Sequence, residues 1–173
     1  MKPIEILQGK WLGHPVHPAV VHLPLALWIG AALLDVLVLL DIQVVTLSRL
    51  AFYAVLLGLL GALVAIPTGI ADWLPIKSGK PARRLGRTHM VLNLLATGLF
   101  AANFLLRLNA LEAPRPVTLP IAATSLLGAA VIAFSGYLGS LLVFEHGISV
   151  ARLSKGRWRE EAIRGGSNVP PKT

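Results

Sequence analysis

The sequence predicts an all-α integral membrane protein, folded as an up-down four-helix bundle with both termini in the cytoplasm. Of its 173 residues, 55% are hydrophobic and 14% are charged, and the mean hydropathy is +0.71. Soluble domains carry about 25% charged residues. Four apolar stretches are each long enough to cross roughly 30 Å of hydrocarbon at about 1.5 Å per residue. They are residues 19–40, 50–70, 90–106 and 119–144.

The chain divides into three regions. Residues 1–18 form a cytoplasmic N-terminal segment with a His-Pro motif, residues 19–150 form the bundle, and residues 151–173 form a basic tail that we expect to be partly disordered. The first apolar stretch is too long for a signal-peptide core, so we expect no cleavage. Three prolines, at positions 24, 67 and 120, are expected near span ends, where a missing backbone donor costs least.

The distribution of basic residues predicts the orientation. Of the 16 lysines and arginines, only Arg49, Arg107 and Arg115 fall on the side opposite the termini. Basic residues favour the cytoplasmic side, which places both termini there. The net charge of +8 follows from this topology and from attraction to anionic lipid headgroups. The expected partner is therefore the lipid bilayer, and no nucleic acid is expected.

The chain contains no cysteine. This excludes thiolate zinc sites, iron-sulfur clusters, disulfides and covalent c-type haem. Any metal or cofactor must be held by histidine, carboxylate or backbone groups.

All five histidines are predicted to lie where the spans meet the cytoplasmic side. Histidine is the commonest metal ligand and changes charge near neutral pH, so this grouping indicates a shared site. A following proline disfavours helical backbone, so His14 and His17 are expected on an extended or turn-like segment. These two are expected to lie at the mouth of the bundle, while His22, His89 and His146 are expected to reach into it.

Three other polar side chains are expected in the same layer. Asp72 ends the second span, where it could fix a histidine tautomer, ligate a metal or accept a proton, or pair with an arginine of the middle loop. Asn93 lies one helical turn from His89 and either orients a ligand or bridges to a neighbouring helix. Glu145 is expected to turn toward the basic loop.

The outer half of the bundle carries two polar residues of interest. Asn103 is expected to bridge two helices. Asp35 is expected near the outer surface, either as an interfacial carboxylate that snorkels or pairs with arginine, or as one end of a proton route. Stripes of small residues in the second and fourth spans permit close helix packing. They would also let two bundles pair as a homo-oligomer.

Several motifs resemble those of domain-of-unknown-function family 2231, a family of predicted bacterial four-helix membrane proteins. They are Gly-His-Pro-x-His-Pro at 13–18, Ile-Ala-Asp-Trp at 70–73, Arg87-x-His89-x3-Asn93, and Gly136-x-x-Gly139 followed by Glu145-His146-Gly147. The resemblance implies a location in the bacterial inner membrane. Because some family members are similar or joined to Rieske-type ferredoxins, it also implies a redox setting with a separate soluble partner.

The first functional hypothesis is a b-type haem protein that transfers electrons, with its cofactor near the cytoplasmic face. Bundle interiors commonly house cofactors. The first and third helices of an up-down bundle lie diagonally, so His22 and His89 are the expected haem ligands, with His146 and His89 as the alternative pair. The further cofactor-binding candidates are His17, His14 and Asn93.

The second hypothesis is a divalent transition metal, zinc, iron or copper, held without haem. Its expected ligands are His22, His89, His146, Asp72 and Glu145. A third hypothesis is a structural or assembly subunit whose histidines only form hydrogen bonds. The sequence shows no nucleophile with a base and no phosphate-binding glycine loop, and it leaves open whether the protein is an enzyme.

Overall fold

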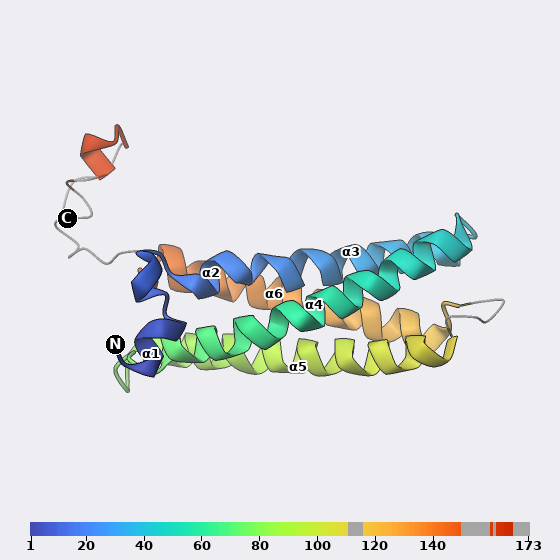
Figure 1. The fold of residues 1–173 in the computed structure, drawn as a ribbon, viewed down its shortest axis with the longest axis horizontal. Helices are drawn as coiled ribbons and strands as arrows, with labels where there is room; N and C mark the ends of the chain where they lie inside the picture. The colour runs from blue at the N-terminus through green and yellow to red at the C-terminus, as the bar shows by residue number, and fades with distance from the viewer. Residues whose placement is uncertain (111–115, 150–159, 161, 168–173) are drawn as a thin grey trace.

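The computed structural model describes residues 1–110, 116–149, 160 and 162–167. Four long helices run alternately up and down as a bundle (Figure 1), which confirms the predicted fold class. The first span joins α2 (Val16–Val20) to α3 (His22–Leu39), and the others are α4 (Val44–Trp73), α5 (Pro81–Ala110) and α6 (Leu119–Phe144). Before them lie α1 (Pro3–Leu7) and the short 3-10 helix η1 (Lys10–Leu12). The predicted basic tail lies mostly outside the described residues.

Each long helix packs against two neighbours. Helix α3 contacts α4 and α6, and α5 contacts the same two helices. The first and third spans therefore lie on a diagonal of the bundle, as the up-down topology predicts. Residues of these two spans can meet only across the core.

Helices α4 and α5 extend beyond both ends of the predicted apolar stretches, whereas α6 coincides with the predicted 119–144. The third span was predicted at 90–106, but α5 covers Pro81–Ala110 because Pro81 begins the helix and the polar residues that follow continue it. Pro67 was predicted near a span end, but it lies inside α4. Membrane helices tolerate an internal proline because neighbouring groups satisfy the freed backbone carbonyl.

The N-terminal segment turns into the first span at the His-Pro motif. Pro15 has extended backbone at the N-terminal cap of α2, and His14 precedes it outside any helix. His17 was also predicted on an extended or turn-like segment, and this is wrong because it lies within α2. Pro18 occupies the first turn of that helix, where a backbone N–H has no intrahelical acceptor to lose.

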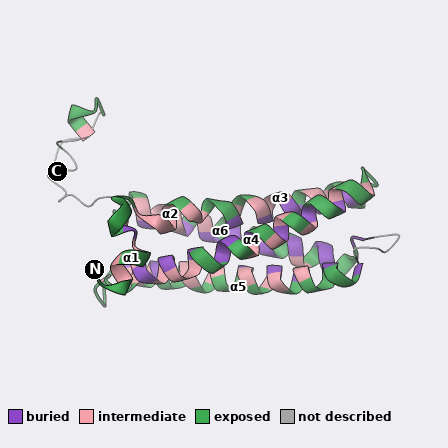
Figure 2. Cartoon of the chain, viewed as in Figure 1, coloured by how far each residue is buried: buried purple, intermediate pink, exposed green. Residues whose placement is uncertain are grey.

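The core is narrow and its centre is aromatic. Buried residues line the inside of the bundle while exposed residues cover its outside (Figure 2), including many large apolar side chains that suit contact with lipid. Trp28 of α3 and Phe100 of α5 stack at the centre, with ring centroids 4.6 Å apart. Gly58 of α4 packs under Trp28, and Gly128 of α6 packs under Phe100.

A polar network crosses the bundle nearer the end opposite the N-terminus. Asp35 pairs with Arg107, whose Nε also donates to Oδ1 of Asn103 at 2.7 Å. Asn103 donates to the backbone oxygen of Ile121 in α6 at 2.8 Å, which confirms its bridging role. Pairing of Asp35 with arginine is also confirmed. Asp35 lies four residues before the end of α3, in keeping with its predicted depth, but its side chain is 0% exposed and so faces the core instead of snorkelling.

Candidate functional site

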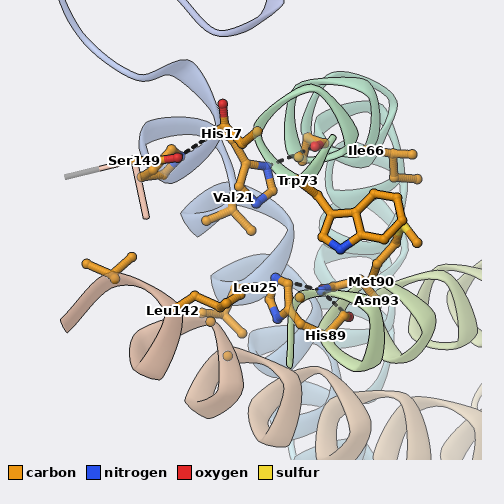
Figure 3. Close-up of a pocket in the computed structure, with 18 of the residues that line it drawn as sticks. His17, Val21, Leu25, Ile66, Trp73, His89, Met90, Asn93, Leu142 and Ser149 are labelled. Atoms are coloured by element: carbon orange, nitrogen blue, oxygen red, sulfur yellow. Dashed lines mark hydrogen bonds between the residues drawn. The ribbon is translucent and has the colours of Figure 1, made fainter. Parts of the chain in front are cut away.

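A cavity of about 410 Å³ opens in the end of the bundle that carries the N-terminus, here called the histidine end. All four spans line it (Figure 3), with Leu25 from α3, Ile66 from α4, Met90 from α5 and Leu142 from α6. Most of its wall is apolar, and a few polar side chains converge on it. This combination is typical of cofactor and small-molecule sites.

His17 enters the cavity from α2 and rests against α4. Its Nδ1 lies 2.9 Å from the backbone oxygen of Ala65 and 3.5 Å from the hydroxyl of Thr68. The ring lies directly on Gly69, where a Cβ atom would be 2.7 Å from the ring Cε1. The glycine therefore makes room for the imidazole.

His89 enters from α5 and rests against α6 in the same manner. Its Nδ1 lies 2.8 Å from the backbone oxygen of Ser135 and 3.0 Å from the hydroxyl of that residue. A Cβ atom at Gly139 would lie 2.9 Å from the ring Cε1 of His89. Gly139 therefore leaves space for the imidazole of His89.

The two imidazoles point toward each other across the cavity (Figure 3). Their centroids are 6.5 Å apart and their planes are inclined by 83°. A backbone oxygen can only accept, so the Nδ1 atoms of His17 and His89 carry the proton and donate it. Each neutral ring then has its lone pair on Nε2, the tautomer that ligates metal through Nε2.

Asn93 links His89 to α6. Its Nδ2 lies 2.9 Å from Oγ of Ser135 and 2.8 Å from the backbone oxygen of His89. It also lies 3.1 Å from Nε2 of His89. The predicted bridge to a neighbouring helix is confirmed, and the same amide lies beside Nε2 of the imidazole.

Asp72 and Trp73 lie at the mouth of the cavity. Asp72 accepts a hydrogen bond from Oγ of Ser149 at 2.7 Å, and none of the arginines that the structure describes in the middle loop forms an ion pair with it. Trp73 stacks under the guanidinium of Arg83, with Cζ 3.5 Å from the ring centroid, and its Nε1 donates to the backbone oxygen of Arg83 at 3.1 Å. Nη1 of Arg83 donates to three carbonyl oxygens around the end of α4. The arginine thus fixes one wall of the cavity.

The remaining candidates lie away from the paired imidazoles. His22 borders the cavity but is exposed, whereas His17, which was expected at the mouth of the bundle, is the more buried of the two. His14 is exposed, with Nδ1 3.1 Å from the oxygen of Pro15. Glu145 is exposed just after α6, and His146 follows it outside the cavity wall.

The described residues contain no group of three histidine and carboxylate side chains close enough to share a metal ion. The expected ligand set of His22, His89, His146, Asp72 and Glu145 is therefore not assembled in this part of the chain. Two imidazoles do converge, those of His17 and His89, and they come from the diagonal first and third spans, whereas the pair expected there was His22 and His89.

Comparison with known families gives a match over residues 13–152, to a family described as predicted membrane proteins and designated DUF2231. This covers most of the chain. The chain belongs to the DUF2231 family. Neither the curated proteins nor the solved structures gave a match. The family description states membrane location and no chemistry, so the chemistry of this DUF2231 protein has to be inferred from its site.

Sequence reasoning missed several contributors to the site of this DUF2231 protein. The backbone oxygens of Ala65 and Ser135 carry no signal of their own in a sequence. The glycines that leave space for the rings do give a sequence signal, because Gly69 and Gly139 each lie four residues after the residue whose backbone oxygen binds the histidine. Spacing that places a carbonyl and a glycine on one helix face marks a surface where a ring can dock.

Proposed function

We propose that this DUF2231 protein binds one b-type haem through His17 and His89 and serves in electron transfer. The observation that carries the proposal is the facing pair of imidazoles, with centroids 6.5 Å apart. Two imidazoles on opposite sides of one metal atom have centroids separated by roughly 6 Å, since each metal–nitrogen bond is about 2 Å long. The spacing therefore suits two axial ligands.

The surroundings of the two rings support this role. Each Nδ1 is held by a backbone oxygen, of Ala65 for His17 and of Ser135 for His89. Such partners orient a ligating imidazole and increase its basicity. Because these hydrogen-bond acceptors are backbone oxygens, no additional side chain is needed to orient the two imidazoles. The site thus resembles a prepared pair of axial ligands.

The donor set favours haem over a metal ion without a macrocycle. A bare zinc, iron or copper ion takes at least three protein ligands, and the described residues bring no such group together. A porphyrin supplies four nitrogens itself, so the protein adds only the axial ligands. The apolar side chains around the cavity, including Leu25, Trp28 and Leu94, suit the faces of a macrocycle.

Bound haem would cycle between its ferric and ferrous forms and so carry one electron. The chain would contribute the axial imidazoles, an apolar wall that excludes water, and a mouth formed by Asp72 and Trp73. With the positive-inside orientation this mouth faces the cytoplasm of a bacterial inner membrane. A separate soluble redox protein, such as a Rieske-type ferredoxin, is the partner that the setting favours.

The proposal is tested by an absorption spectrum and metal analysis of protein purified from a host with ample haem. We expect a Soret band and about one haem per chain. His17→Ala and His89→Ala should each lower haem retention, while the matched variants His22→Ala and His146→Ala should keep it. Colourless protein with stoichiometric metal would favour the metal hypothesis, and colourless protein without metal would favour a structural role. Either result would contradict haem binding.

A further inference from the structure

The first and third spans carry equivalent residues 72 positions apart, and these residues meet in pairs along the core. His17 faces His89, Trp28 stacks on Phe100, and Asp35 pairs with Arg107. The fully buried residues Ala31 and Asn103 keep the same offset. Three contacts at three depths of the bundle therefore obey one spacing.

The second and fourth spans show the same relationship with an offset of 70. The backbone oxygens of Ala65 and Ser135 bind the two histidines. Gly69 and Gly139 seat those rings, and Gly58 and Gly128 seat the rings of Trp28 and Phe100. In the sequence, Leu-Leu-Gly stands at 56–58 and again at 126–128.

The bundle is thus two equivalent helical hairpins, one made of α2, α3 and α4 and the other of α5 and α6. Their first helices run in the same direction (Figure 1), so the axis that relates them runs along the bundle. Membrane proteins built from parallel repeats have this kind of axis along the membrane normal. The axis passes between the two imidazoles, and a ligand held by both lies on it.

This equivalence is broken beside the imidazoles. Val21 in the first hairpin corresponds to Asn93 in the second, and both line the cavity. The amide of Asn93 lies 3.1 Å from Nε2 of His89. In the part of the chain that the structure describes, the hydrogen bonds of His17 are made through Nδ1. One Nε2 is thus engaged by an amide and the other faces the cavity.

This inequivalence has a chemical consequence. If His89 held a metal through Nε2, it would lose its hydrogen bond with Asn93, whereas His17 would lose none of its described hydrogen bonds on doing so. The amide would therefore stabilise the unligated imidazole of His89. Oγ of Ser135 and the backbone oxygen of His89 keep the amide in place. A net hydrogen bond of this kind changes an equilibrium by roughly two- to tenfold.

We infer that His17 is the fixed axial ligand and His89 the exchangeable one, with Asn93 as the positioning residue that allows a small neutral donor molecule to bind the iron on the His89 side. This inference rests on the proposed function. It adds ligand exchange at the haem to electron transfer.

The test compares three haem-loaded full-length proteins: the unmodified chain, Asn93→Val and Val21→Asn. Each substitution copies the residue of the other hairpin, so the pair forms a matched control. Carbon monoxide is the probe for the ferrous protein, and the low-spin fraction of the ferric protein is the second readout. We expect Asn93→Val to raise the low-spin fraction and slow carbon monoxide uptake roughly two- to tenfold, because His89 no longer has a competing partner. Val21→Asn should shift both readouts in the opposite direction.

Two further measurements separate the possible failures. The melting temperatures of the haem-free proteins report folding, and Asn93→Ala replaces Asn93→Val if the latter melts much lower. His17→Ala should lose more haem affinity than His89→Ala. Equal losses, or unchanged readouts in both Asn93 variants, would overturn the assignment while leaving haem binding intact. A chain that takes up no haem would overturn the proposed function itself.

Discussion

Asp35 and Arg107 form an ion pair across the diagonal of the bundle, with Nη2 of Arg107 donating to Oδ2 of Asp35 at 2.5 Å. Their exposed fractions are 0% and 2%. The two residues occupy equivalent positions of the two hairpins. If two copies of the first hairpin paired with each other, Asp35 would meet a second buried carboxylate. The ion pair therefore favours pairing of unlike hairpins, a use of buried charge that coiled coils also show.

Removing one charge of this pair should destabilise the bundle strongly. We expect Asp35→Asn to cost about 3–5 kcal/mol in the free energy of unfolding, because it leaves the guanidinium of Arg107 buried without a counter-charge. The exposed Asp41 offers the control Asp41→Asn, with an expected change within about 0.5 kcal/mol. Denaturant unfolding in detergent measures both. Equal effects of the two substitutions would refute the structural importance of the pair.

The glycine under Trp28 should resist replacement. A Cβ atom at Gly58 would overlap with Nε1 of the buried Trp28, so we expect Gly58→Ala to destabilise the protein by about 1–3 kcal/mol through overpacking. At Gly98, nothing lies within 4 Å of the added atom. Gly98→Ala should therefore stabilise α5 by roughly 0.5–1 kcal/mol. Thermal melting of the two variants should shift in opposite directions, and a shared direction would contradict this packing.

The glycines that seat the imidazoles should matter for cofactor binding. Gly69→Ala and Gly139→Ala would place a Cβ atom 2.7 Å and 2.9 Å from the rings of His17 and His89. Since the rings must shift, we expect each variant to bind haem at least about tenfold more weakly, a change of roughly 1.4 kcal/mol. Haem titration followed at the Soret band measures this. Gly30→Ala is the control, because the added Cβ atom meets nothing within 4 Å. If the Gly69 and Gly139 variants bound haem as tightly as this control, the two glycines would not be needed to position the imidazoles.

The absence of cysteine makes the orientation directly measurable. Ser78 lies between α4 and α5, and Thr118 precedes α6 at the opposite end of the bundle. Both are exposed. From the positive-inside rule we expect Ser78→Cys to be protected from an impermeant thiol reagent in intact cells and Thr118→Cys to react. The reverse pattern would invert the proposed orientation and would place the mouth of the cavity outside the cytoplasm.

The sequence by itself determined that this protein is a four-helix membrane bundle. Length and polarity decide that outcome almost alone, because a lipid environment requires each span to satisfy its backbone hydrogen bonds within a helix. The same reasoning predicted that the histidines lie at one end of the bundle and that the first and third spans lie on its diagonal.

Only the tertiary structure decided which histidines meet. His17 and His22 both lie in the first span. The choice between them depends on the rotation of that helix and on Pro18, which lies in the first turn of α2 instead of preventing the helix. The partners of His17 and His89 are backbone oxygens over glycines. Such groups become specific only when two helices pack closely, because any residue type can supply a carbonyl and packing alone selects the one that binds.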